Sequence, residues 1–215
     1  MKTKYTHTDI TQMDRIKRLH LINSITGVKP ANLIGTVSQD GHENLAIFSS
    51  VVHLGSNPPF IGFVLRPHFE FRRDTYNNME HNGYYTINHV PATHTKQAHY
   101  TSAKFDEGVS EFERCGFTPE YLNDFPAPFV KESPVKIGLK KVNEIPIPQN
   151  GTLFVIGQIE LIEVPDWVDE VNGKLNLEKL EIAGISGLNT YYRMQEVGDY
   201  PYARVEEVPP FDKSV

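Results

Sequence analysis

The sequence predicts a mainly β protein, a single antiparallel β-barrel with helical decorations. Its 215 residues suit one barrel-type domain, and its 39% hydrophobic and 22% charged content is ordinary for a protein with a packed core. Strand-sized apolar runs alternate with turn signals, and no repeat or linker separates two cores. We therefore expect one domain over residues 1–215, with its core at about 29–164, a helical arm at 1–28 and an acidic extension at 165–215.

The first expected elements are a short helix and a β-hairpin. Asp9 is expected to be the N-cap of the helix, because apolar residues follow it at helical spacing. Residues 31–38 and 43–48 are predicted to be strands, because the Asp40-Gly41 pair between them is typical of a hairpin turn.

A strand, a helix and a further strand should follow. Residues 60–65 form a nearly continuous apolar run, as expected of a strand that is buried on both faces. Residues 73–81 have the pattern of a polar helix that ends at Asn82-Gly83, and the next strand is predicted at 84–90. Two short helices are expected between 92 and 115, the second of them stopped by Gly116.

The second half of the chain is predicted to hold a proline-rich stretch and the remaining strands. Four prolines make residues 119–134 largely irregular. Strands are expected at 135–141 and 153–164, around a connection rich in proline and glycine. A helix at 175–182 and a last strand at 190–194 complete the prediction.

Composition excludes several classes of function. The net charge of −6 argues against a general nucleic-acid binder, which needs a basic face. From Lys141 onward there are six Lys and Arg against 13 Asp and Glu, a balance of −7, so any anion site is expected in the nearly neutral remainder. A single cysteine, no signal peptide and no membrane-length apolar run indicate a cytoplasmic protein with no membrane partner.

Several catalytic signatures are missing. The chain has no G-x-G-x-x-G, no phosphate-binding P-loop, no G-x-S-x-G and no H-E-x-x-H. His89, His94 and His99 recur every five residues, a spacing that does not suit a metal site. Cys115 is interpreted as a packing residue and Trp167 as a cover over a core edge. No catalytic or metal-binding residue is predicted.

Two stretches do indicate a ligand. Ser49 and Ser50 end a strand with hydroxyl groups and backbone amides that can bind a planar heterocycle, although a simple serine turn is the alternative. Further on, three arginines precede a helix start, where a phosphate would find guanidinium donors, a threonine hydroxyl and the positive end of the helix, with Asp74 as its N-cap. The alternative is a solvated loop.

Taken together, the motifs between Lys29 and Val164 resemble the flavin reductase-like family. No single motif is specific, but their order and spacing jointly are. The matching segments are Asn32-Leu-Ile-Gly-Thr36, Asp40-Gly41, Asn44-Leu-Ala46, Phe48-Ser49-Ser50, Asn57-Pro-Pro59, Arg73-Asp-Thr75 with Asn78, Thr86-Ile-Asn88, Val109-Ser-Glu-Phe112, Cys115-Gly116, 127–134 and Gly157-Gln-Ile-Glu160.

The resemblance implies an FMN-binding split barrel of the antiparallel Greek-key type. The ring system would lie at the strand end and the phosphate at the helix start, with further contacts from two arginines and a neighbouring strand. The implied cofactor-binding residues are Phe48, Ser49, Ser50 and Val51 for the ring, Arg73, Asp74 and Thr75 for the phosphate, Arg66 and Arg72 as second contacts, and Asn88 and His89 closing the site. Many family members have Lys where Arg73 stands, and the segment from Leu175 onward does not align.

The resemblance also implies a reaction. NADH or NADPH would reduce the bound FMN, which passes electrons to free flavin or to another acceptor, while the protein supplies binding and orientation. Family members are usually homodimers with the flavin at the subunit interface, so the same is expected here. Two alternatives stay open: a non-catalytic FMN-binding electron carrier, and a pyridoxamine-phosphate-oxidase-like protein that binds another ligand.

Overall fold

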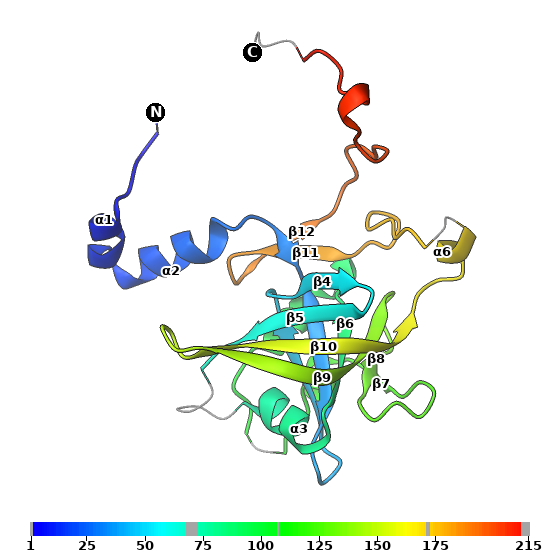
Figure 1. The fold of residues 1–215 in the computed structure, drawn as a ribbon. Helices are drawn as coiled ribbons and strands as arrows, with labels where there is room; N and C mark the ends of the chain where they lie inside the picture. Colours follow the sequence, from blue (N-terminus) through cyan, green and yellow to red (C-terminus); the bar gives the residue numbers. More distant parts are fainter. Residues whose placement is uncertain (1, 68–72, 107, 171–172, 212–215) are drawn as a thin grey trace.

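A computed structural model describes residues 2–67, 73–106, 108–170 and 173–211, and its centre is a seven-stranded antiparallel sheet (Figure 1). The strand order is β3-β2-β6-β9-β10-β5-β4. The strands are β2 (Asn32–Val37), β3 (Glu43–Phe48), β4 (Val52–Ser56), β5 (Pro59–Leu65), β6 (Tyr84–His89), β9 (Lys136–Ile147) and β10 (Thr152–Glu163). The mainly β class predicted from the sequence is confirmed.

The predicted hairpin is present, and β4 is a strand that the sequence pattern did not indicate. Strands β2 and β3 pair from Asn32 opposite Phe48 to Val37 opposite Glu43. The missed strand β4 is a short edge strand whose residues are mostly exposed, so it lacks the alternation of buried and exposed side chains that marks a half-buried strand.

Strands β3 and β4 are the two edges of the sheet, yet only residues 49–51 separate them in the chain. The sheet must therefore curl until its edges approach each other at this link. It curls around the principal core, whose largest members include Phe63, Tyr85 and Ile87. The ladders run from edge to edge without joining β3 to β4, so closure into a barrel stays a prediction.

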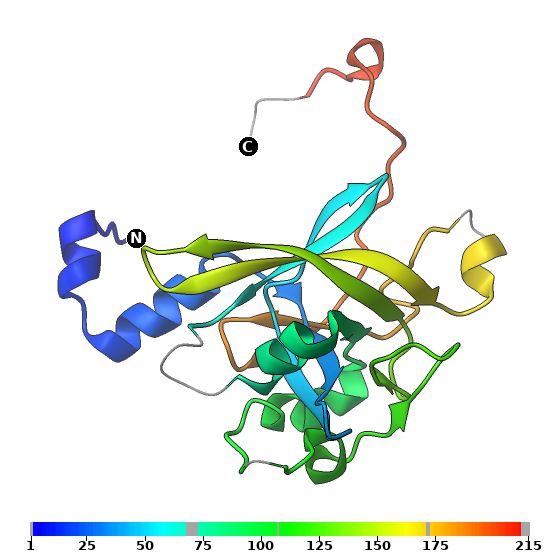
Figure 2. The ribbon, with the colours of Figure 1, turned by 60° about the horizontal axis from the view of Figure 1, so that its bottom comes forward.

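The long ribbon of β9 and β10 crosses the body of the molecule (Figure 2). Strand β10 lies close to its predicted position, whereas β9 continues six residues beyond the predicted end at Lys141. The pairing of β6 with β9 ends at Tyr84 opposite Lys140, so beyond that point β9 has β10 as its neighbour in the sheet. An edge of this kind tolerates Pro146, which has no N–H to donate.

The helix α3 (Asp74–Asn82) ends at Gly83, which has the left-handed φ of 77° that a glycine C-cap needs. Helices α4 (Thr95–Tyr100) and α5 (Glu111–Cys115) follow a 3₁₀ turn η1 (Ala92–His94), and α5 stops at Gly116 as predicted. The prediction of Asp74 as the N-cap of α3 is wrong. Arg73 holds that position, and Asp74 already belongs to the first turn, where a carboxylate suits the positive end of the helix.

The N-terminal residues form two helices, α1 (His7–Gln12) and α2 (Arg15–Ser24). Asp9 is not the N-cap of α1. Thr6 caps the helix, and the Asp9 carboxylate accepts hydrogen bonds from the backbone and hydroxyl of Thr6 in a capping box. Asp14 then caps α2, which separates it from α1.

The predicted helix at 175–182 is wrong, because this segment consists of turns. The Asn176 side chain accepts a hydrogen bond from the Lys179 amide at 2.7 Å, and Glu181 has a φ of 50°, outside the helical range. Leu180 and Ile182 nevertheless pack into the principal core. The segment leads into a small sheet of β1 (Lys29–Pro30), β11 (Ala183–Ser186) and β12 (Thr190–Arg193).

The remaining elements are short. The proline-rich stretch is mostly irregular, as predicted, with the two-residue strands β7 (Pro119–Glu120) and β8 (Phe129–Val130). Helix α6 (Trp167–Glu170) follows β10, and Trp167 packs against the principal core as the sequence suggested. The last element is a 3₁₀ turn η2 (Val205–Glu207).

Candidate functional site

The link 49–51 lies where the two sheet edges approach each other, and its backbone lies outside the neighbouring ladders. The pairing of β3 stops at Phe48 and that of β4 starts at Val52. The Ser50 hydroxyl fastens the link to β5, because it donates to the Val64 carbonyl at 3.0 Å and accepts from the Val64 amide at 3.1 Å. This hydroxyl is therefore a positioning group, and the backbone around it is what the link can offer to a ligand.

Beside this link, a row of side chains crosses three strands on the side of the sheet that faces the principal core. Phe48 of β3 lies opposite Asn32 of β2, which lies opposite His89 of β6. Phe48 packs edge-on against Phe63 with ring centroids 5.1 Å apart. Asn32 was not among the predicted flavin contacts, although a polar residue at an inward position of an apolar strand can indicate a binding site.

Three buried side-chain atoms of this row have no hydrogen-bond partner among the described residues. Asn32 is 1% exposed, and neither its Oδ1 nor its Nδ2 is bonded to any residue that the structure describes. The buried Nδ1 of His89 is likewise unpartnered, and burial lowers the pKa of this imidazole to about 4. Unpaired buried polar groups cost free energy, so they need a water molecule or a ligand.

The predicted phosphate end contains two arginines at a helix start. Arg73 is half-buried, and its Nε donates to the Pro67 carbonyl at 3.3 Å. Burial and the nearby charge of Arg66 both lower the pKa of Arg73. The side chain of Arg73, the N-cap residue, makes no capping hydrogen bond at the N-terminus of α3. Arg72, the third predicted arginine, lies outside the described residues.

A buried polar network fixes the start of α3 against the sheet. The Asn44 amide donates to the hydroxyls of Thr36 and Thr75 at 3.0 and 3.2 Å, and Asn78 donates to Thr36 at 3.1 Å. Thr75 is thus an anchor whose hydroxyl proton is left to donate. The network also gives the spacing between the predicted phosphate end and the predicted ring end. Asn44 lies on β3 four residues before Phe48, which is about 13 Å along the strand.

Asn88 does not join the other predicted contacts, because it points to the opposite side of the sheet. Its amide donates to the Leu33 carbonyl at 3.2 Å and to the Thr86 hydroxyl at 2.8 Å, and its Oδ1 accepts from the Val130 amide at 3.0 Å. It is fully buried, and it holds the proline-rich segment onto β6. That Asn88 helps to close the flavin site stays a prediction.

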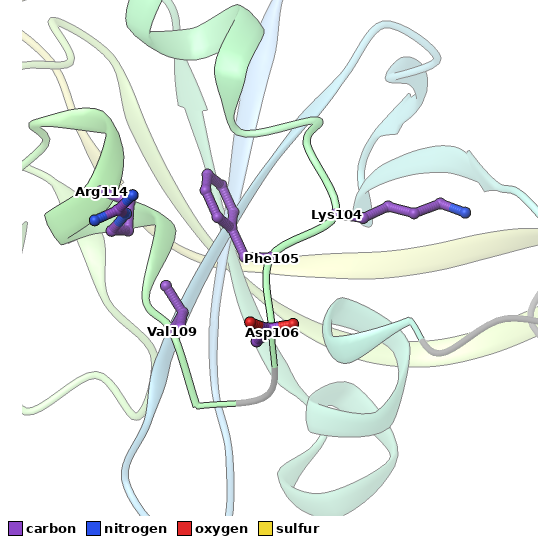
Figure 3. A pocket seen from close by; sticks show the side chains of 5 residues that line it. All are labelled: Lys104, Phe105, Asp106, Val109 and Arg114. Atoms are coloured by element: carbon purple, nitrogen blue, oxygen red, sulfur yellow. The ribbon is translucent and has the colours of Figure 1, made fainter.

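A surface pocket of about 310 Å³ lies elsewhere, between α5 and the loop that precedes it (Figure 3). Its lining residues are Lys104, Phe105, Asp106, Val109 and Arg114, none of them a predicted flavin contact. Arg114 also lines a neighbouring pocket that includes Cys115. Burial and Glu111 raise the pKa of the Cys115 thiol, which makes it a poor nucleophile.

The described residues contain neither a candidate metal site nor a helix that could span a membrane. No group of three or more His, Cys, Asp or Glu side chains there can hold a metal ion. Within the same residues, no helix combines the length and apolarity needed to cross a membrane.

Comparisons with known proteins identify the fold and the family. A protein from Shewanella frigidimarina, provisionally assigned as a flavin reductase with a split barrel domain, is 44% identical; the alignment covers 94% of this chain and 100% of that one, with a TM-score of 0.89. Flavoredoxin of Desulfovibrio vulgaris is 25% identical over 82% of this chain and 92% of its own, with a TM-score of 0.70. An uncharacterized protein from Aquifex aeolicus is 28% identical over 80% of this chain and 88% of its own.

The family match covers most of the chain. The pattern described as the flavin reductase like domain matches residues 28–175, which include the link 49–51, the start of α3 and every strand of the central sheet. The two ends of the chain, before residue 28 and after residue 175, lie outside the match. The chain belongs to the flavin reductase-like family.

Proposed function

We propose that this protein binds FMN and acts as an oxidoreductase that uses NADH or NADPH to reduce free flavin or another acceptor. The observation that carries the proposal is the pair of like charges at the start of α3. Arg73 is half-buried beside Arg66, and its side chain does not cap the helix that begins behind it. An anion placed there would relieve the repulsion between the guanidinium groups and satisfy the helix end.

The phosphate of FMN fits this position chemically. Arg66 and Arg73 would donate to its oxygens, and the Thr75 hydroxyl proton is available for a further bond. The network of Asn44, Thr36 and Asn78 holds α3 in place before a ligand arrives. A site that is already ordered loses less entropy on binding.

The isoalloxazine ring fits the link 49–51. The hydroxyl of Ser50 is used by Val64, so the backbone amides of the link would be the donors to the pyrimidine edge of the ring. Asn32 and His89 lie in the adjacent row with unpartnered polar atoms. Ordered water in that row would bridge to the ring, because Asn32 is buried and His89 is half-buried.

When bound, the flavin supplies the chemistry by accepting two electrons from a nicotinamide and passing them on. The contribution of the chain is binding, orientation and electrostatics. Amides at the link would stabilise negative charge that develops on the pyrimidine side of the reduced ring. His89 is neutral at pH 7 because of its lowered pKa, so it adds no positive charge to this side. No side chain is required as a proton donor.

The proposal includes two copies of the chain with a flavin at the subunit interface. The link 49–51 joins the two sheet edges and lies at the surface, since each of its residues is only partly buried. A second copy placed there would exclude water from the exposed side of the ring.

Titration with FMN and with riboflavin tests the phosphate position. Arg73→Ala and Arg66→Ala should each weaken FMN binding by about tenfold to a hundredfold, as expected for a lost charge-assisted contact, and should leave riboflavin binding unchanged. Lys131→Ala, a surface lysine on the irregular segment, is the matched control. Equal FMN affinity in all three variants would show that the phosphate lies elsewhere.

The reaction is tested with the FMN-loaded protein under nitrogen. NADH or NADPH should bleach the flavin absorption band within seconds to minutes. If neither nicotinamide bleaches the band while dithionite does, the protein is a flavin-binding carrier and the reductase proposal fails.

A further inference from the structure

Two terminal segments fall outside the family match and stand away from the body of the molecule. We call residues 2–27 the N-terminal arm and residues 195–211 the C-terminal tail. The arm contains α1 and α2, and the tail contains η2. Figures 1 and 2 both show the arm and the tail leaving the sheet in different directions.

The N-terminal arm lacks the packing that its helices need. Helices α1 and α2 have six and ten residues, and neither has a buried residue. Isolated helices shorter than about 12–15 residues are marginal in water, and most helical stability in proteins comes from packing of an apolar face. Such a face exists: Ile16, Leu19 and Ile22 recur every three residues along α2 and are 54%, 40% and 41% exposed. The arm is therefore built for a surface that the single chain does not supply.

The C-terminal tail is apolar and exposed as well. Val197, Tyr200, Tyr202 and Val205 are 84–95% exposed, and Phe211 is 77% exposed. The base of the tail is fastened to its own chain, because Asp199 forms an ion pair with Lys174 and Glu196 accepts from the Asn176 amide at 2.8 Å. A run of aromatic and branched side chains held out into solvent is typical of an interaction surface.

The two segments carry opposite charges. The N-terminal arm has five Lys and Arg against two Asp, a balance of +3, and the C-terminal tail has one Arg against four Asp and Glu, a balance of −3. Both acidic residues of the arm are occupied at helix starts: Asp9 accepts from the Thr6 backbone in the capping box of α1, and Asp14 caps α2 by accepting from the amides of Ile16 and Lys17 at 3.0 Å each. The outward charge of the arm is consequently basic.

We propose that the N-terminal arm of one copy packs against the C-terminal tail of a second copy. In a two-fold symmetric dimer each copy supplies one arm and one tail, so both unpartnered segments are covered at once and the assembly closes. Apolar contact between α2 and the tail provides the burial, and the opposite charges fix which segments meet. This pairing is independent of flavin, because it uses neither the link 49–51 nor α3.

A charge-reversal cycle on the full-length protein tests the pairing. Lys2→Glu/Lys4→Glu/Arg15→Glu changes the arm from +3 to −3, and Glu206→Lys/Glu207→Lys changes the tail from −3 to +1. Each variant alone should lower the dimer affinity in sedimentation equilibrium by on the order of tenfold at low salt. An equimolar mixture of the two should recover dimers, because each arm then meets a tail of opposite charge.

Controls separate this pairing from general effects of charge. Lys96→Glu/Lys131→Glu makes a change of the same sign on the body and should leave the dimer affinity unchanged. A monomeric wild-type protein, reversed variants that dimerise like wild type, or a mixture that stays dissociated would each overturn the proposal. FMN and riboflavin affinity, measured per chain, test the flavin site separately, so the pairing of arm and tail can fail while the flavin site stands. A monomeric wild-type protein would overturn both this pairing and the proposed dimer, but not the flavin site.

Discussion

Where β2 begins and β6 ends, the two sides of the sheet treat buried polar groups in opposite ways. On one side Asn88 and Thr86 have their side-chain polar groups bonded to backbone or to each other. On the other side, one residue along the strands, three buried side-chain atoms of Asn32 and His89 have no partner among the described residues. Saturated groups hold the fold together, whereas unsatisfied groups are tolerated where a ligand or ordered water completes them. This difference distinguishes residues that hold the fold together from residues that still have hydrogen bonds to offer.

Breaking the saturated side should have the largest effect. Asn88→Leu would leave the buried Val130 amide without its partner, at about 1–3 kcal/mol, and would remove the side-chain hydrogen bonds to the Leu33 carbonyl and the Thr86 hydroxyl, at about 0.5–1.5 kcal/mol each. The free energy of unfolding should therefore fall by about 2–6 kcal/mol. Urea denaturation measures the loss. A change below about 1 kcal/mol would mean that this side does not hold the irregular segment in place.

On the unsatisfied side, His89 should make stability depend on pH. Its pKa is lowered to about 4 in the folded state against about 6.5 when unfolded, so the unfolded chain binds more protons between these values. The stabilising contribution is therefore complete above about pH 6.5 and is lost as the pH falls toward 4, by up to about 3 kcal/mol. Denaturation at pH 4.5 and pH 7 should show a smaller difference for His89→Leu than for wild type.

Gly35 lies on the side of the sheet where the polar groups are hydrogen-bonded, at the point where the proline-rich segment packs closely against β2. A Cβ on Gly35 would lie 2.2 Å from the Pro128 carbonyl oxygen and 2.7 Å from the Thr86 hydroxyl. Gly35→Ala should therefore cost about 1–3 kcal/mol through displacement of the segment that Thr86 binds. Gly55→Ala serves as a control for loss of a glycine without crowding, because its φ is outside the left-handed region and its added Cβ would meet nothing nearer than the Pro58 carbonyl oxygen at 3.4 Å. Equal and small losses in both variants would argue against tight packing on this side.

The smallest change is expected for Asn32→Leu. Removing two unpartnered polar atoms and filling the space with carbon should leave the stability of the FMN-free protein within about 1 kcal/mol of wild type, or raise it. The same substitution should weaken FMN binding if water in this row bridges to the ring. Denaturation and FMN titration of one preparation give both numbers. A loss as large as that of Asn88→Leu would show that the two sides do not differ.

Local chemistry made much of the fold predictable. The β2–β3 hairpin and the ends of α3 and α5 depend on an Asp-Gly pair and on glycines with positive φ, which a short window of sequence reveals. The segment 175–182 has a helical pattern of apolar residues, but long-range packing of Leu180 and Ile182 overrides it. Strand β9 extends past its prediction because β10 pairs with it, a fact absent from its own residues.

The candidate site divides in the same manner. The arginines and the start of α3 are neighbours in sequence, so the position of Arg73 at the N-terminus of the helix was predictable. The role of Asn88 was not, because its backbone partners Leu33 and Val130 lie 55 and 42 residues away. Asn32 was missed because its importance depends on the residue opposite it in another strand.

The three-residue link between β3 and β4 has a length that is fixed by the elements it connects. It spans the distance between the two edges of the sheet, and Ser50 at its middle bonds both backbone groups of Val64. Adding or deleting one residue would put a different side chain opposite Val64 and would turn β4 over, so that its alternate residues exchange faces. Length at this position is thus under tighter constraint than side-chain identity, and variation among relatives should replace residues here rather than insert them.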